Sequence, residues 1–163
     1  MAKNKEEKTN VMRVLEQKKI AYTAHTYPHE EGMAVDGVTV AKSMGFDPAI
    51  VFKTLVARGV SKQYYVFDVP VAENLDLKKA AKAVGEKSIE MIHQKELLPL
   101  TGYVHGGCSP VGMKKLFPTV FHSSAENLAA MIVSAGKIGY QVELSPRDLA
   151  ALVRAKFADI IVE

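Results

Sequence analysis

The chain has 163 residues, 48% of them hydrophobic and 24% charged, which suits one compact domain with a sizeable core and argues against a two-domain enzyme. Its apolar runs fall far below the roughly 18 residues that cross a bilayer, and its polar start is not followed by the apolar segment of a secretory signal. The net charge of +3 permits a nucleic-acid partner but gives no dense basic face. The single cysteine, Cys108, cannot form an internal disulfide and fits a reducing cytoplasm.

Helix signals alternate with strand patterns along the first half of the chain. A short polar side chain can begin a helix by accepting from its free amides, and a glycine can end it. In chain order the sequence predicts a polar tail at 1–8, a helix from Thr9 or Asn10 to before Ile20, a strand at 20–25, a helix at 36–44, a hairpin of strands 51–58 and 63–69, and a basic helix from Asp76 to Gly85. The hairpin is the clearest of these, because two β-rich runs flank a short turn that contains Gly59.

The second half predicts a glycine-rich stretch followed by further strands. Glycines punctuate 101–112 too densely for a helix, so we interpret it as strand, loop and strand. Beyond Pro118 we expect strands at 119–121, 131–134, 140–144 and 157–162, a short helix at 125–128, and a helix capped by Ser145. Since no repeat or linker interrupts the chain, residues 9–163 are expected to form one domain. Strands joined both by hairpins and by helices favour an α+β fold with a mixed, largely antiparallel sheet flanked by helices.

Lys53 is the first candidate functional residue. It interrupts an apolar strand, and the period of two along a strand puts it on the same face as Val51 and Leu55. Such a lysine lies either at a solvated sheet edge, where lysines block aggregation, or in a pocket. The residue pattern by itself favours the edge.

Two glycine-containing loops are candidate binding sites. Gly106 and Gly107 precede Cys108, and paired glycines let backbone amides approach a phosphate, a carbonyl or an oxyanion, although they also suit a plain tight turn. Ser134 and Gly136 lie where a strand enters a second turn, so the hydroxyl can bind a substrate or the turn's own backbone. The first loop lacks the lysine spacing of a phosphate-binding loop and the full dinucleotide fingerprint.

The histidines and the cysteine give weaker signals. His25 and His29 are four residues apart, but Pro28 lies between them and denies them one helical face, so we expect no metal site. A reactive Cys108 would need a base and a lowered pKa, and the sequence shows neither. A partly buried, unreactive thiol is the simpler interpretation, with a redox sensor as its alternative.

Seven separated motifs follow one another between about Val11 and Ile160. They are His25-Thr26-Tyr27, Phe52-Lys53-Thr54-Leu55, Leu75-Asp76-Leu77-Lys78-Lys79, Thr101-Gly102-Tyr103, Gly106-Gly107-Cys108-Ser109-Pro110, Val133-Ser134-Ala135-Gly136-Lys137 and Lys156-Phe157-Ala158-Asp159-Ile160. This succession resembles the YbaK/EbsC family, the free-standing Cys-tRNA(Pro) deacylases related to the editing domain of bacterial prolyl-tRNA synthetase. The resemblance implies one α+β domain around a mixed, barrel-like sheet, and an enzyme that removes a wrongly attached amino acid from the 3′ end of tRNA.

The resemblance also implies roles for single residues. Lys53 matches the family's essential strand lysine, so the resemblance favours a pocket rather than a sheet edge for it. The implied role of its ammonium group is to hold the terminal phosphate or ribose of the tRNA and to polarise the ester. The residues implied to bind the substrate are Tyr27, Thr54, Gly106, Gly107, Ser134, Gly136 and Gln141. An aminoacyl ester is already activated, so positioning and carbonyl polarisation can suffice without a protein nucleophile. The resemblance implies that the substrate's own thiol is the nucleophile and that a cyclic thiolactone is released. Cys108 is then dispensable.

The chain departs from the family pattern at two positions. Gln141 stands where the cysteine-specific bacterial members carry an aspartate, and Ala135 stands where glycine is usual. Gln141 keeps hydrogen-bonding capacity without the charge that could hold an α-ammonium group, so a module that binds an aminoacyl end or a nucleotide without cleaving it remains an alternative. The resemblance implies aminoacyl-tRNA as partner, prolyl-tRNA synthetase as a further candidate, a cytoplasmic location, and no metal, cofactor, DNA or membrane.

Overall fold

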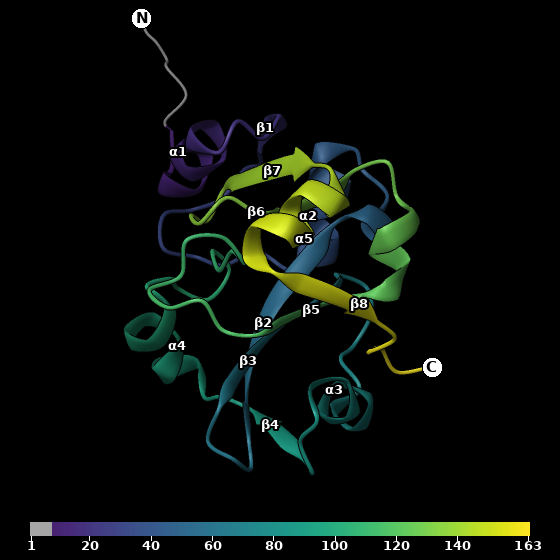
Figure 1. Cartoon of the computed structure of the whole chain (residues 1–163). Coiled ribbons are helices and arrows are strands. Elements are labelled where there is room, and N and C mark those ends of the chain that lie inside the picture. The colour runs from purple at the N-terminus through teal and green to yellow at the C-terminus, as the bar shows by residue number, and fades with distance from the viewer. Residues whose placement is uncertain (1–7) are drawn as a thin grey trace, which may run out of the picture.

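The computed structural model describes residues 8–163, so most of the predicted polar tail lies outside the described residues. Five helices and eight strands follow one another along this part of the chain (Figure 1). The helices are α1 (Asn10–Gln17), α2 (Gly37–Met44), α3 (Leu77–Val84), α4 (Gln94–Thr101) and α5 (Pro146–Val153), with 3-10 turns at Pro48–Ile50 and Ser123–Asn127. The strands are β1 (Tyr22–Thr26), β2 (Phe52–Gly59), β3 (Tyr64–Pro70), β4 (Ile89–Met91), β5 (Thr119–His122), β6 (Met131–Ser134), β7 (Tyr140–Leu144) and β8 (Ala155–Ala158).

The strands form two sheets, which one isolated bridge connects. The three-stranded sheet has the order β1-β7-β6 and is antiparallel throughout. The five-stranded sheet has the order β4-β2-β3-β5-β8, with β2 antiparallel to both its neighbours and β5 parallel to both of its own. A single parallel bridge between Val51 and Ile132 joins the two sheets. Two open sheets joined in this way, rather than a closed barrel, make up the mixed, largely antiparallel α+β fold that the sequence predicts.

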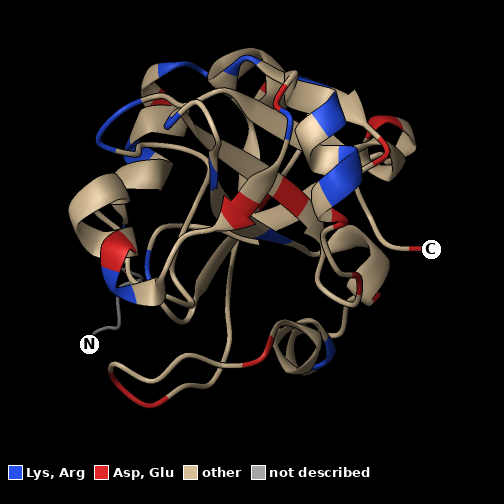
Figure 2. Cartoon of the chain, turned by 90° about the horizontal axis from the view of Figure 1, so that it is seen from below, with Lys and Arg blue, Asp and Glu red and all other residues tan. Residues whose placement is uncertain are grey.

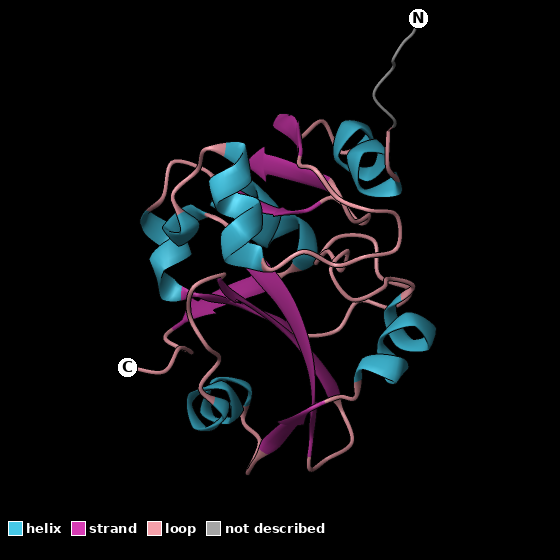
Figure 3. Ribbon diagram, turned by 180° about the vertical axis from the view of Figure 1, so that it is seen from behind, coloured by secondary structure: helices cyan, strands magenta, loops and turns pink. Residues whose placement is uncertain are grey.

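Apolar side chains pack into three clusters, and the helices lie around the strands (Figure 3). The largest cluster draws on both sheets and on Leu15 of α1 and Leu149 of α5, both with 0% exposure. Full burial of one such leucine stabilises the fold by about 1.5–3 kcal/mol. A second cluster lies between α3 and the five-stranded sheet, and a third surrounds α2 beside the Val51–Ile132 bridge. The third cluster therefore supports the junction of the sheets.

The predicted helix caps are confirmed. Asp36, for example, accepts a hydrogen bond from the backbone amide of Thr39 at 3.1 Å, and α2 ends at Gly45 with a φ of +80°. The same kind of side-chain acceptor begins α1, α3 and α5, at Thr9, Asp76 and Ser145. Such caps contribute about 1 kcal/mol each, which explains why these short helices begin where the sequence indicates.

The prediction for 101–112 is wrong, because the structure has no strand there. The stretch begins at the end of α4 and continues as a loop whose polar groups bond within the loop itself. Thr101 Oγ1 accepts from the Tyr103 amide at 3.0 Å, and the Tyr103 hydroxyl donates to the Val111 carbonyl. These local bonds satisfy the backbone without a neighbouring strand.

Other boundaries also differ from the prediction. The last strand is β8, Ala155–Ala158, rather than 157–162, because its partner β5 ends where His122 pairs with Ala158. The first strand begins two residues late, and the predicted helix at 125–128 is the 3-10 turn at 123–127. The sequence interpretation missed β4 and α4, since β4 has only three residues and Pro99 lies inside α4.

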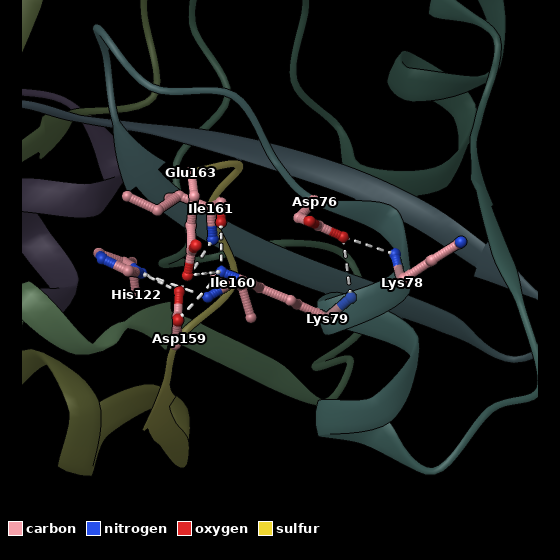
Figure 4. A network of polar contacts seen from close by, with 8 residues as sticks. All are labelled: Asp76, Lys78, Lys79, His122, Asp159, Ile160, Ile161 and Glu163. Carbon is pink, nitrogen blue, oxygen red and sulfur yellow. Dashed lines mark hydrogen bonds and ion pairs between the residues drawn. The ribbon is translucent and has the colours of Figure 1, made fainter.

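One lysine of α3 binds the C-terminal residues through ion pairs and a hydrogen bond (Figure 4). Lys79 Nζ lies 3.1 Å from Asp159 Oδ2 and 3.2 Å from Glu163 Oε2, and it donates to the Ile161 carbonyl at 2.9 Å. Behind it, His122 Nδ1 accepts from the Ile160 amide at 3.3 Å. Burial lowers the pKa of His122, which keeps a lone pair on this nitrogen for that amide.

Candidate active site

A cavity of about 370 Å³ lies beside the junction of the sheets, within the roughly 300–1,000 Å³ typical of small-molecule sites. Its wall combines four segments that are far apart in the sequence. They are residues 51–55 at and just before the start of β2, the 34–37 segment that leads into α2, three residues of the glycine-rich loop (His105, Gly106 and Cys108), and Ser134 with Gln141 from the three-stranded sheet. Tyr27, Val40, Val71 and Leu97 complete the wall.

Lys53 lies in this cavity rather than at a solvated sheet edge. The start of β2 is held between β3 and the Val51–Ile132 bridge, so the strand around Lys53 is an interior one. The Lys53 side chain is half-buried and forms no hydrogen bond or ion pair with any residue that the structure describes. Burial lowers its pKa, while the charges of Asp36 and Glu73 act in the opposite direction. A half-buried cation without a partner is suited to an anionic ligand group.

Thr54, the next residue of β2, links the cavity to a buried acid. Its hydroxyl donates to Asp68 Oδ1 of β3 at 2.5 Å, and the two residues pair directly across the strands. Asp68 has 0% exposure, and its Oδ2 has no hydrogen-bond partner among residues 8–163. Burial raises the pKa of Asp68 to about 7, although the bond from Thr54 opposes this shift. Sequence reasoning missed Asp68; its signal was one acid in the otherwise uncharged run Tyr64–Pro70.

Ser134 and Gln141 form the opposite wall. They pair directly between β6 and β7 and are both 7% exposed. Ser134 Oγ accepts from the Gly136 amide at 3.1 Å, which leaves its hydroxyl proton free for a ligand. Gln141 Oε1 is buried and has no hydrogen-bond partner in the described part of the chain. An unpartnered buried acceptor beside a cavity is suited to a ligand that donates a hydrogen bond.

The glycine loops differ in how they contribute. Gly106 lines the cavity, whereas Gly107 and Gly136 do not. A Cβ atom at Gly107 would come within 3.1 Å of the Ile138 backbone nitrogen, and one at Gly136 within 3.0 Å of the Tyr103 ring. Gly107 and Gly136 therefore let the loops pack closely together. Gly106 is the one of the three that lies on the cavity wall.

Cys108 and Tyr27 contribute buried, unreactive surface to the wall. The thiol is 8% exposed, and burial raises its pKa to about 12, so almost no thiolate exists near pH 7 to act as a nucleophile. Tyr27 is 5% exposed, and burial raises its pKa as well.

Of the predicted site residues, the cavity brings together Lys53, Tyr27, Thr54, Gly106, Ser134 and Gln141. His105 and Asp36 line it in addition.

Residues 29–152 match the family of aminoacyl-tRNA editing domains, which is more than half of the chain. The chain belongs to this family. Over 161 residues, 98% of either chain, this editing domain is 45% identical to a protein of Enterococcus faecalis named "Putative Cys-tRNA(Pro)/Cys-tRNA(Cys) deacylase EbsC". The resemblance that the seven motifs indicate is confirmed.

Solved structures share the fold of this editing domain. A crystal structure described as "a putative trans-editing enzyme for prolyl tRNA synthetase" superposes with a TM-score of 0.79, covers 94% of this chain and 95% of its own, and is 24% identical. A hypothetical protein of known structure gives a TM-score of 0.82 at 20% identity, with 93% and 99% covered.

The wall of the editing domain can bind an ester and stabilise charge on it. Lys53 supplies a cation, Gln141 an acceptor and Ser134 a free hydroxyl proton, and all three lie on one cavity. Such fixed groups stabilise developing charge most effectively in a site that excludes water. Among the described residues, no three His, Cys, Asp or Glu side chains gather into a group that could hold a metal ion.

Proposed function

We propose that this editing domain is a free-standing deacylase that removes cysteine from mischarged tRNA, with Cys-tRNA(Pro) as its main substrate. The observation that carries the proposal is the half-buried ammonium of Lys53, which no described residue pairs with, in a cavity of about 370 Å³. The 45% identity to a protein named as a deacylase of Cys-tRNA(Pro) and Cys-tRNA(Cys) supports the choice of substrate. Charged tRNA is used in the cytoplasm, where we place the protein.

The chemistry uses the substrate's own sulfur. The cysteine thiolate attacks the ester carbonyl, so a carbon–sulfur bond forms, the bond from the carbonyl carbon to the ribose oxygen breaks, and that oxygen takes up a proton. The products are a cyclic thiolactone and free tRNA. Lys53 holds the phosphate or ribose of the tRNA end and stabilises the negative charge that develops on the ester. Because Cys108 is protonated at neutral pH, it takes no part.

Selection of the amino acid rests on the cavity, and selection of the tRNA rests on a partner. A single methylene group changes binding by only about 1–3 kcal/mol, so the size of the cavity gives limited discrimination. The reacting thiol adds to it, because alanine and proline lack one. The net charge is +3, and Figure 2 shows basic and acidic positions spread over several elements. Prolyl-tRNA synthetase bound to the same tRNA would raise the local substrate concentration and so supply the specificity for tRNA(Pro).

The test is deacylation of Cys-, Ala- and Pro-tRNA(Pro) by the wild type, Lys53→Ala and Cys108→Ser, with products identified by mass. We expect the wild type and Cys108→Ser to release thiolactone from Cys-tRNA(Pro), and Lys53→Ala to be inactive. Equal inactivity of all three forms together with tight tRNA binding would favour the binding module, which the uncharged Gln141 motivates. Activity that depends on Cys108 would contradict the assigned chemistry.

Addition of prolyl-tRNA synthetase to the same assay tests the partner. The rate for Cys-tRNA(Pro) should rise relative to that for Cys-tRNA(Cys). If the ratio of the two rates does not change, specificity for tRNA(Pro) does not come from the synthetase.

A further inference from the structure

Asp68 is a buried acid for which the fold gives no structural reason. It lies in the middle of β3 with 0% exposure, and one of its two oxygens has no hydrogen-bond partner within the part of the chain that the structure describes. Burial of a charge without an opposite charge is strongly unfavourable, and the only hydrogen bond that the structure records for the Asp68 side chain comes from Thr54. An apolar residue at this position would serve the sheet better, so the carboxyl group calls for a functional explanation.

The link from Asp68 to the cavity runs through Thr54. Thr54 lines the cavity, while Asp68 lies behind it at 2.5 Å from its hydroxyl oxygen. Asp68 is an acceptor when ionised, so the hydroxyl proton of Thr54 points toward it and the oxygen lone pairs of Thr54 remain for a donor in the cavity. A thiol is such a donor.

We propose that Thr54 and Asp68 form a relay that takes the proton from the substrate thiol. The inference rests on the proposed function, because the thiol belongs to the cysteine of the substrate. The thiol proton passes to Thr54 Oγ1 as the Thr54 hydroxyl proton passes to Asp68 Oδ1. The sulfur keeps the electron pair and attacks the ester carbonyl. When the ribose oxygen leaves, it gains a proton from solvent, and Asp68 returns its own to solvent between turnovers. Thr54 is then a catalytic residue and Asp68 the acceptor that acts through it.

The surroundings of Asp68 suit this task. Burial raises the pKa of Asp68 to about 7, which lies within about two units of a free thiol, whereas an ordinary aspartate lies more than four units away. Proton transfer to the buried carboxylate is therefore far easier. The titratable group that faces Asp68 from the glycine-rich loop is Cys108, and its own pKa of about 12 keeps it neutral. On the neighbouring strands, Asp68 pairs with the uncharged Thr54 and Phe121.

The experiment measures single-turnover deacylation of Cys-tRNA(Pro) between pH 5.5 and 8.5. Asp68→Asn keeps the shape of the side chain but cannot take up a proton, so the rate constant should fall on the order of 100-fold. In the wild type the rate should rise with pH and show an inflection near the Asp68 pKa of about 7. This rise should disappear in Asp68→Asn. The affinity for uncharged tRNA(Pro) should not change. Asp148→Asn, an exposed acid of α5, is the matched control and should behave as the wild type.

Variants of Thr54 separate a relay from a structural role. Thr54→Ser retains the hydroxyl and should keep most of the rate, whereas Thr54→Val should lose about as much as Asp68→Asn. The double variant should lose no more than either single variant, because both remove the same step. Thermal unfolding of each variant shows whether it is folded.

The outcomes distinguish this inference from the proposed function. A wild type that does not release thiolactone from Cys-tRNA(Pro) overturns the proposed function. A wild type that does so, with Asp68→Asn equally fast and equally dependent on pH, overturns the relay alone. Additive losses in the double variant also overturn the relay.

Discussion

Gly106 and Ala34 are in direct contact above the cavity: a Cβ atom at Gly106 would lie 2.7 Å from the Ala34 Cβ. Gly106 also has a φ of +90°, in the region that favours glycine. Both residues line the cavity, although they belong to two different loops. The contact therefore fixes how closely the glycine-rich loop approaches the segment that leads into α2.

The contact predicts that Gly106→Ala lowers deacylation by moving this wall. Gly45→Ala is the matched control, because Gly45 has a φ of +80° and nothing within 4 Å of an added Cβ. Both variants should lose about 1 kcal/mol of stability from backbone strain, and Gly106→Ala should lose more because its Cβ meets Ala34. Only Gly106→Ala should also lose activity, measured as kcat/KM for Cys-tRNA(Pro). Equal activity of the two variants would show that the wall tolerates the shift.

Lys53→Met should abolish activity without destabilising the fold. The ammonium is half-buried and unpaired within residues 8–163, so its removal breaks no recorded bond, while loss of a positioned charge reduces rates about 100- to 1,000-fold. Lys42→Met, an exposed lysine of α2, is the control. Deacylation rates and urea unfolding measure the two effects. A loss of stability in Lys53→Met comparable to its loss of activity would point to a structural lysine instead.

Asp68 should make the protein less stable as the pH rises. The pKa of Asp68 is about 7 in the folded protein, against an ordinary value of 3.8. Between these pH values the folded protein binds a proton that the unfolded chain does not bind. The free energy of unfolding therefore falls from about pH 4 to about pH 7. The contribution of this one group is on the order of 4 kcal/mol. Asp68→Asn should remove it and be more stable than the wild type at pH 8. Denaturant unfolding at several pH values measures the difference, and parallel curves for the two proteins would refute the shift.

Gln141→Leu should weaken substrate binding rather than folding. Gln141 Oε1 is a buried acceptor without a partner, so its removal relieves an unsatisfied group in the free protein but takes an acceptor from the bound substrate. We expect KM for Cys-tRNA(Pro) to rise by roughly 10-fold, which corresponds to one lost hydrogen bond. Gln17→Leu, at an exposed position of α1, is the control. An unchanged KM would remove Gln141 from the binding residues.

Lys79→Met should loosen the C-terminal segment. Lys79 contacts Asp159, Ile161 and Glu163, whereas its neighbour Lys78 is exposed and serves as the control variant. The amide hydrogen of Val162, which bonds to the Asn74 carbonyl at 2.9 Å, should exchange faster in Lys79→Met only. If exchange there is unaffected, backbone pairing alone holds this segment.

Local signals in the sequence predicted most elements, but not the surroundings of Lys53. Caps and strand periods depend on neighbouring residues, so Asp36, Gly45 and the β2–β3 hairpin were correctly placed. Whether Lys53 lies at an edge or in a cavity depends on the bridge between Val51 and Ile132. No local pattern contains that bridge, and only the family resemblance indicated the cavity.

The remaining misses have physical reasons of the same kind. The glycine-rich loop bonds internally through Tyr103, so its alternation of apolar residues and glycines imitates strands. Pro99 lies inside α4 although proline disfavours a helix interior. Asp68 is an acid on a central strand, although acidic residues are normally found at the surface. Its pairing with Thr54 follows only from the register of β2 and β3.

The single bridge between Val51 and Ile132 has an evolutionary consequence. Lys53 and Thr54 belong to one sheet, and Ser134 and Gln141 to the other, so the room left for an amino acid depends on the angle at which the sheets meet. Ile132 is not itself a wall residue, yet a larger or smaller side chain there would tilt one sheet against the other. We therefore expect that substitutions of Ile132 change which amino acids the cavity accepts while Lys53, Thr54, Ser134 and Gln141 stay the same.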